Sequence, residues 1–213
     1  MKQKQNRLFF FGVLLILIAI LAYSLIDRRK EEDVMQKIEK FRREKDEAFK
    51  YRDDSPIENR EAFSHLNYFP PNVQYRIKAR WVPVDENEAD FLVQMTDSTF
   101  DRLRSVAYAF FEYEGKEYQL LLFEKEDNAG YWFLPFKDAS NGKETYEGGR
   151  YLDVEKPKGN TLILDFNFAY NPYCAYSPDY SCPIPPKQNH LDFAILAGEK
   201  KFVTADSSST SKP

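Results

Sequence analysis

One apolar run near the N-terminus constrains this chain more than any other feature. Residues 8–26 read LFFFGVLLILIAILAYSLI and contain no charged side chain. As a helix rising about 1.5 Å per residue they would cover about 28 Å, close to the roughly 30 Å hydrocarbon core of a bilayer. The run therefore predicts a transmembrane helix that anchors the chain in a membrane.

A cleaved signal peptide is the alternative to an anchor. The apolar stretch of such a peptide is usually about 7 to 15 residues long and ends at a site of small residues. Ala22 and Ser24 flank Tyr23 at the end of this run and form a weak site of that kind. The greater length of the run favours an uncleaved signal-anchor.

The charges beside the run predict its orientation. Cations stand on both sides of it, at Lys2, Lys4, Arg7, Arg28, Arg29 and Lys30. These cations nearly balance, but the short N-terminal tail, its α-amino charge and the order of charge before apolar run favour an N-terminus inside the cell. We expect residues 1–7 to form a cytoplasmic tail and the globular part to lie outside the cytoplasm, in a periplasm or the extracellular space.

The composition beyond the run suits one folded domain. The chain has 213 residues, of which 43% are apolar and 16% aromatic, enough for a packed core in a domain of about 100 to 200 residues. After the run there are 27 basic and 34 acidic side chains. This net negative charge argues against a nucleic-acid partner, which would require a basic surface.

Two helices are expected after the run. Residues 27–50 are rich in charge, and their apolar residues recur at steps of three and four, which predicts an amphipathic helix that serves as a charged stalk. A partner-binding coiled coil is the alternative, although the apolar stripe is short for several heptads. Ser55, Pro56 and Glu58 form a capping box that predicts a short second helix at 57–66.

The apolar pattern changes to a period of two after Pro70 and Pro71. Apolar residues from Val73 to Trp81 alternate with polar, mostly basic ones, as in a half-buried strand. Further strands are predicted at 91–95, 105–113, 118–123, 131–136, 150–154, 161–168 and 191–196, with a hairpin turn at 114–116. These strands predict a mainly β (β-rich α+β) domain over 51–204, a barrel or a sandwich of short antiparallel strands. The polar residues 205–213 are expected to be disordered.

Three motifs lie in an unusual stretch at 136–199. They read F-x-D-x-x-x-G-x-x-T-Y-x-x-G-R-Y-L from Phe136, D-F-N-x-A-Y-N-P-x-C-A-Y from Asp165 and C-P-x-P-P-x-x-N from Cys182. Glycines at 142, 148 and 149 permit backbone turns of definite shape in the first motif. Over roughly 41–200 the chain resembles the bacterial family catalogued as domain of unknown function 1684. That resemblance implies a secreted or membrane-associated protein and provides no catalytic residues.

The two cysteines of the chain lie in the second and third motifs. Cys174 and Cys182 are eight residues apart, and in an oxidising compartment they are expected to form a disulfide. A metal site would need further ligands, and His190 is the only imidazole nearby. The spacing matches no zinc pattern, so neither a metal nor another cofactor is predicted.

Polar side chains of the same stretch are candidates for a functional site. A carboxylate beside an arginine and an imidazole can act in acid–base catalysis, which makes candidates of Asp138, Arg150, Asp165 and His190. A ligand pocket could be lined by Arg150, Asn167, Tyr170 and Asn171. The alternative is structural, a buried salt bridge of Arg150 with Asp165 or Asp138 that holds the loops together.

Function is less constrained than fold. One hypothesis is a single-pass, membrane-anchored module of the bacterial envelope that is structural or binds an unknown small molecule or envelope component. A second is a hydrolase of an envelope substrate, with Asp165 or Asp138 as base and Arg150 holding an anionic group. A third is a subunit of an envelope complex. No P-loop, dinucleotide-binding, serine-hydrolase or zinc-protease motif decides between an enzyme and a binding protein.

Overall fold

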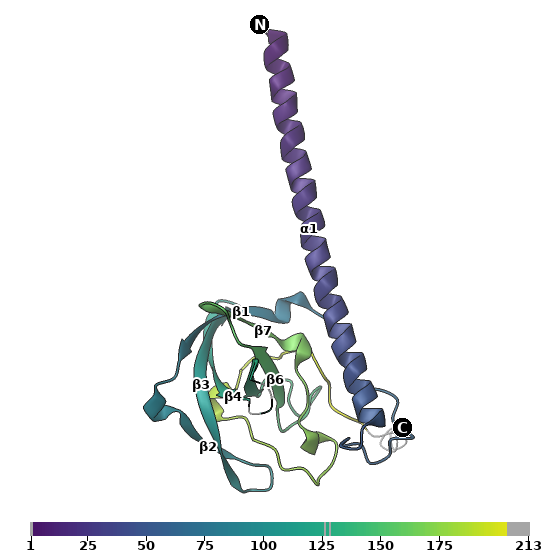
Figure 1. Cartoon of the computed structure of the whole chain (residues 1–213), viewed down its shortest axis with the longest axis vertical. Coiled ribbons are helices and arrows are strands. Elements are labelled where there is room, and N and C mark those ends of the chain that lie inside the picture. The colour runs from purple at the N-terminus through teal and green to yellow at the C-terminus, as the bar shows by residue number, and fades with distance from the viewer. Residues whose placement is uncertain (1, 126, 128, 204–213) are drawn as a thin grey trace. The chain divides into compact units, whose positions relative to one another are not determined.

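A computed structural model of the chain describes residues 2–125, 127 and 129–203, without the side chains at 2–11, 27 and 30. The chain forms two compact units, Met1–Phe41 and Arg42–Pro213. Helix α1, Lys2–Tyr51, makes up the first unit and continues into the beginning of the second (Figure 1). The tail predicted at 205–213 lies outside the described residues.

Helix α1 joins the predicted anchor and the predicted stalk without a break. No proline precedes Pro56, and α1 ends at Tyr51, shortly before that proline. In the described part of the chain, no helix combines the length and the apolar character that crossing a membrane requires. The transmembrane helix predicted at 8–26 is therefore not found, and residues 8–11 of that prediction lie among those whose side chains are not described.

The short helix predicted at 57–66 is wrong, because the segment consists of turns and loop. The hydroxyl of Ser55 accepts a hydrogen bond from the Ile57 amide and donates one to the carbonyl of Phe49, which ties the segment to the end of α1. The apolar residues that suggested a helix pack in a separate cluster of Phe49, Ile57, Phe63 and Leu66. Burial against α1 thus outweighs the local capping signal.

The second unit is mainly β, as predicted. Its strands are β1 Arg76–Pro83, β2 Asp90–Gln94, β3 Phe100–Tyr113, β4 Lys116–Glu124, β5 Tyr131–Phe136, β6 Arg150–Glu155 and β7 Thr161–Asp165. Short 3₁₀ turns are η1 Val73–Tyr75, η2 Glu86–Glu88, η3 Phe166–Phe168, η4 Tyr173–Ala175 and η5 Lys187–Asn189. The strands form one antiparallel sheet in the order β6-β5-β4-β3-β1-β7, and β2 pairs with β3.

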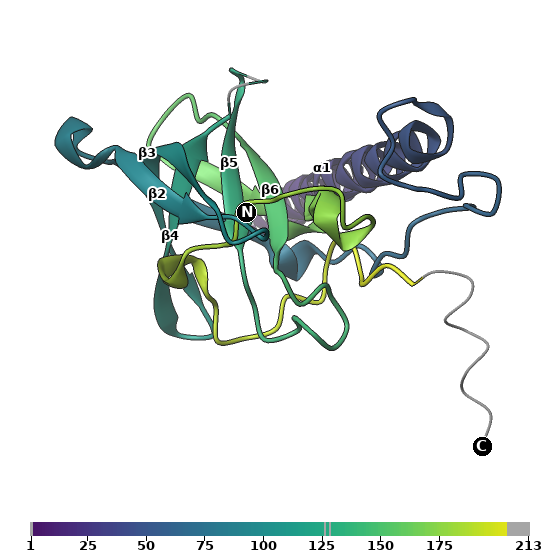
Figure 2. The ribbon, with the colours of Figure 1, turned by 90° about the horizontal axis from the view of Figure 1, so that it is seen from below.

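The sheet curves into a nearly closed barrel (Figure 1). Figure 2 shows β5 and β6 side by side at one end of the strand order. The chain beyond β7 returns to β6, where Tyr151 and Tyr170 exchange two backbone hydrogen bonds of 2.8 and 2.9 Å. Closure of this kind pairs strand edges that would otherwise be open. Of the two predicted architectures, the barrel is therefore the correct one.

Side chains alternate across the wall of the barrel. On β1, Ile77 and Ala79 are buried in the core, while the basic residues that alternate with them, Arg76, Lys78 and Arg80, are exposed, as the period of two predicted. The first three residues of that predicted strand form η1 instead. The hairpin predicted at 114–116 is confirmed, with positive φ at Glu114 and Gly115 in the tight turn between β3 and β4.

The strand predicted at 191–196 is wrong. The segment is irregular and is held by single hydrogen bonds, from the Leu191 amide to the Lys137 carbonyl at 2.8 Å and from the Ala139 amide to the Phe193 carbonyl at 3.0 Å. Its apolar residues Leu191 and Ile195 are nevertheless buried in the core. The apolar spacing of this segment therefore corresponds to burial in the core, although the segment forms no continuous ladder of strand hydrogen bonds.

Gly149 is expected to tolerate no side chain. Its φ is +99°, and an added Cβ would lie 2.7 Å from the carbonyl oxygen of Phe136. We expect Gly149→Ala to lower the free energy of unfolding by more than about 1 kcal/mol, measured by denaturant unfolding of the full-length chain. Gly159→Ala is the matched control, because nothing lies within 4 Å of its added Cβ, and it should be neutral or slightly stabilising. Equal effects of the two substitutions would contradict the prediction.

Candidate functional site

Arg150 is the most deeply buried charged residue of the predicted site. It begins β6, and none of its surface is exposed. Its Nη2 donates to Asp138 Oδ2 and to the carbonyl of Ile195, both at 2.8 Å. Its Nη1 donates to the carbonyls of Ala197 at 2.5 Å and Glu199 at 3.2 Å. Both terminal nitrogens are therefore fully used within the protein, and among the described atoms Nε has no hydrogen-bond partner.

The three carbonyls show how the C-terminal segment is shaped. In an extended strand the carbonyls of residues 195 and 199 would stand about 13 Å apart, too far for one guanidinium to reach both. The segment must therefore curl around Arg150. Gly198 permits this with a φ of +74°, and a Cβ there would lie 2.6 Å from the carbonyl oxygen of Ala169.

Asp138 completes the buried pair. While Oδ2 binds Arg150, Oδ1 accepts hydrogen bonds from the Ser140 amide at 2.9 Å, the Ser140 hydroxyl at 2.5 Å and the Ile195 amide at 3.1 Å. Burial lowers the pKa of the Arg150 guanidinium, and the Asp138 carboxylate opposes that shift. The salt bridge with Asp138 that the sequence offered as a structural alternative is present, with both side chains fully buried.

Asp165 lies in a different network. Its Oδ2 is 3.3 Å from Nε of Arg76, and its Oδ1 accepts from the amide and the Nδ2 of Asn167 at 3.2 and 2.8 Å. Asn167 in turn binds the backbone of Asn72, accepting at 2.8 Å and donating at 2.9 Å. Burial raises the pKa of Asp165, although Asn167 and Arg76 both oppose the shift. These contacts tie the end of β7 to the segment before β1.

Asn171 belongs to a cluster around Glu199, which is fully buried. The Nδ2 of Asn171 donates to Oε1 of Glu199 at 2.9 Å, and the Tyr176 hydroxyl donates to the same oxygen. Lys45 of α1 donates to Oε2 at 2.6 Å. Burial first, and then the nearby Glu199, raises the pKa of Tyr176 well above its ordinary value.

Aromatic rings surround the Lys45 ammonium. Its Nζ lies 5.0 Å from the ring centroids of Phe49 and Tyr170 and 5.7 Å from that of Tyr176. Only 12% of the Lys45 side chain is exposed, so the cation is paired and largely desolvated. Within the second unit, this contact fastens the end of α1 to the β domain. We refer to Lys45, Asn171, Tyr176 and Glu199 as the Glu199 cluster.

The predicted site residues thus fall into separate networks, one with Asp138 and Arg150 and another with Asp165 and Asn167. Arg150 reaches the Glu199 cluster through the Glu199 carbonyl, whereas Asp165 and Asn167 pair elsewhere. Tyr170 donates from its hydroxyl to Asp153 at 3.0 Å. His190 is exposed, with Nε2 at 3.1 Å from the Pro185 carbonyl oxygen.

Sequence reasoning missed Lys45. A signal was available, because Lys45 stands four residues after Phe41 and four before Phe49, on the apolar face of a predicted amphipathic helix. A charged residue in that position is expected to find a buried partner. Which partner it finds cannot be read from the helix, because Glu199 lies 154 residues further along the chain.

The two cysteines are free thiols, so the predicted disulfide is not formed. They are nevertheless neighbours, with the Cys174 amide donating to Cys182 Sγ at 3.3 Å. The Tyr146 hydroxyl donates to Cys174 Sγ at 3.8 Å. The Cys182 thiol first, and then Tyr146, lower the pKa of Cys174 to about 7, and the contact with Cys174 raises the pKa of Cys182.

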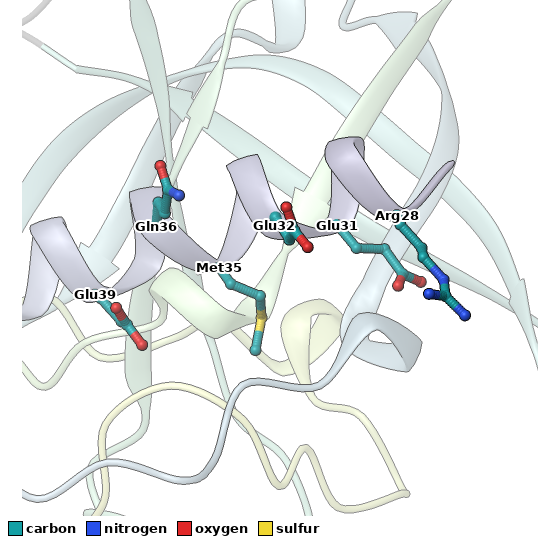
Figure 3. Close-up of a pocket in the computed structure, with 6 residues that line it drawn as sticks. All are labelled: Arg28, Glu31, Glu32, Met35, Gln36 and Glu39. Carbon is teal, nitrogen blue, oxygen red and sulfur yellow. The ribbon is translucent and has the colours of Figure 1, made fainter. Parts of the chain in front are cut away.

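A surface depression runs along α1 in the first unit (Figure 3). It is lined by Arg28, Glu31, Glu32, Met35, Gln36 and Glu39. None of the predicted site residues borders it. In the part of the chain that the structure describes, no three His, Cys, Asp or Glu residues are arranged to hold a metal ion.

The chain therefore contains a barrel-like β domain, in which buried ion pairs and their hydrogen bonds hold the irregular C-terminal segments in place. The family described as Protein of unknown function (DUF1684) matches residues 61–200, and the chain belongs to that family. The resemblance stated from the three motifs is thereby confirmed.

A solved structure supports the same assignment. The solution NMR structure of an uncharacterized protein from Haloarcula marismortui is 36% identical, with a TM-score of 0.64. The match covers 81% of this chain and 96% of that one. No curated protein matches the chain.

Proposed function

We propose that the chain is a membrane-tethered structural module of the cell envelope, held in the bilayer by residues 8–26. The observation that carries this proposal is the exposure of consecutive apolar side chains on α1. Leu15, Ile16, Leu17 and Ile18 are 53 to 67% exposed. Successive helical residues are about 100° apart, so these four side chains point to every side of the helix. Leaving an apolar side chain in water costs about 1.5 to 3 kcal/mol relative to burying it, a cost that lipid would remove.

The proposed orientation places the β domain outside the cytoplasm, in a periplasm or the extracellular space. Its support is the three cations Lys2, Lys4 and Arg7 that precede the apolar run, because charge followed by an apolar segment is the order found in signal-anchors. A reporter that is active only outside the cytoplasm, fused to the C-terminus, should be active. A reporter that works only inside should not.

The structural role is supported by the hydrogen bonds of the polar side chains in the second unit, which are made to partners within the protein. An anionic substrate could bind the Nη atoms of Arg150 only by displacing Asp138 or backbone carbonyls. The Nδ2 groups of Asn167 and Asn171 likewise donate hydrogen bonds to acceptors within the protein. A buried network of this kind stabilises one arrangement of the loops. The proposal therefore assigns these residues to the fold, and the hydrolase hypothesis is tested by the Asp138 substitution below.

Charges placed in the apolar run should release the chain from the membrane. One arginine at the centre of a spanning helix costs about 2.5 to 3.5 kcal/mol. We expect the double substitution Ile16→Arg and Ile20→Arg to move the full-length chain from the alkali-resistant membrane fraction to the supernatant. Immunoblotting of the two fractions measures this change. Gln36→Arg with Glu39→Arg adds the same two side chains outside the run and should leave the chain in the membrane fraction. Loss of both variants from the membrane, or retention of both, would contradict the proposed tether.

A further inference from the structure

We propose that Cys174 and Cys182 form a thiol–disulfide exchange site, in which Cys174 attacks a small-molecule disulfide and Cys182 resolves the product. This inference goes beyond the proposed structural role and does not depend on the membrane tether. It rests on the position of the two thiols, on the difference between their surroundings and on the donors around Cys174.

The backbone holds the two cysteines together. The Cys174 amide donates to Cys182 Sγ at 3.3 Å, so the Cys182 thiol lies against the backbone of Cys174. Cys182 is fixed by Thr96, whose amide donates to the Cys182 carbonyl and whose hydroxyl accepts from the Cys182 amide, both at 3.0 Å. The 3₁₀ turn η4 holds Cys174. Two cysteines held this close need little chain movement to form a disulfide.

The surroundings of the two thiols assign them different roles. Cys174 is partly exposed, whereas Cys182 is buried, with 7% of its surface exposed. A disulfide arriving from solvent therefore meets Cys174 first. Cys182 is placed behind it, where it can attack Cys174 but is shielded from a second molecule of the substrate.

Hydrogen-bond donors favour the thiolate of Cys174. The neighbouring Cys182 thiol first, and then the Tyr146 hydroxyl, which donates to Cys174 Sγ at 3.8 Å, lower the pKa of Cys174 from 9.0 to about 7. Near neutral pH a large share of Cys174 is then the reactive thiolate. The lower basicity makes each thiolate less nucleophilic, which offsets part of the gain from the larger thiolate fraction. Together the two effects should make Cys174 react with a disulfide roughly fivefold faster than an ordinary thiol at neutral pH.

The exchange is balanced in two steps. The Cys174 thiolate attacks one sulfur of the substrate disulfide, forms a mixed disulfide and expels the other sulfur as a thiolate, which takes a proton from water. Cys182 then loses its proton to water and attacks Cys174 Sγ, which expels the second substrate thiolate. The two cysteines are oxidised to one disulfide, and the substrate disulfide is reduced to two thiols.

The test uses the reduced full-length chain and oxidised glutathione as the probe. Mass spectrometry of peptides should find the glutathione adduct on Cys174, forming more than about tenfold faster than on Cys182, followed by a Cys174–Cys182 disulfide. Cys182→Ser should stop the reaction at the Cys174 adduct. Tyr146→Phe removes one donor and should slow the first step and shift its pH midpoint upward from about 7.

Two results would overturn the proposal. One is equal reactivity of the two cysteines in the unsubstituted chain, a measurement that requires no variant to fold. The other is a reduced chain that gains no internal disulfide in excess oxidised glutathione while its circular dichroism remains that of the native fold.

Discussion

Arg150→Met is expected to lower the free energy of unfolding by about 3 to 5 kcal/mol, among the largest effects of any single substitution in this domain. The substitution leaves the Asp138 carboxylate without its cation in a site where neither side chain is exposed. It also removes the donors that hold the carbonyls of Ile195, Ala197 and Glu199. Denaturant unfolding of the full-length chain, followed by circular dichroism, measures the loss.

Asp138→Asn tests the same pair from its other side. It keeps the size of the side chain and removes the charge, so Arg150 becomes the unpaired ion, and a loss of similar size is expected. Arg102→Met is the matched control, because both side chains of the Arg102–Asp90 pair are exposed, at 71 and 62%. That more exposed pair should contribute no more than about 1 kcal/mol.

The Asp138 result also separates the structural proposal from the hydrolase hypothesis. A catalytic base could be neutralised with little loss of stability, because its energetic contribution is made to a reaction. Neutralising a buried ion that holds the fold together instead lowers the free energy of unfolding. Asp138→Asn and Arg150→Met variants as stable as the unsubstituted chain would therefore contradict the structural assignment.

Lys45→Met is expected to be the second large effect, with a loss of about 3 to 5 kcal/mol. The substitution keeps most of the apolar stem of Lys45 against the rings of Phe49 and Tyr170, but leaves the buried Glu199 carboxylate without its cation. The end of α1 should then detach more readily from the β domain. Unfolding measurements give the loss, and faster proteolysis at residues 51–60 would locate it.

Two further variants sharpen the Lys45 experiment. Arg43→Met removes a cation from the exposed side of the same helix and should change stability by less than about 0.5 kcal/mol. Glu199→Gln combined with Lys45→Met should cost less than the sum of the two single substitutions, because the first change removes the ion that the second leaves unpaired. Additive effects would show that the two side chains are not coupled.

Much of the β domain could be predicted from sequence alone. Alternation along β1 and the turn residues at 114–116 act between near neighbours, and the structure has both features. The predicted strand at 131–136 matches β5, whose bounds are Tyr131–Phe136. Local patterns predict such elements well because a strand or a tight turn is selected by the residues within it.

The same local patterns were misleading where apolar side chains are buried against residues that are distant in the sequence. Residues 57–66 carry a helix-capping signal, and residues 191–196 carry the apolar content of a strand, yet each is an irregular segment whose apolar side chains are buried. Apolar spacing reports that a side chain is to be buried. It does not report which surface buries it.

The sequence by itself determined the family, the mainly β class, the helical N-terminal region and the short list of polar residues in the three motifs. Only the tertiary structure decided how those residues pair: Arg150 with Asp138 in place of Asp165, and Asn171 with a glutamate that also binds Lys45. The physical reason is that a buried charge requires a partner, but sequence separation does not restrict which one it finds. The choice is made by the closure of the barrel and by the curl of the C-terminal segment around Arg150.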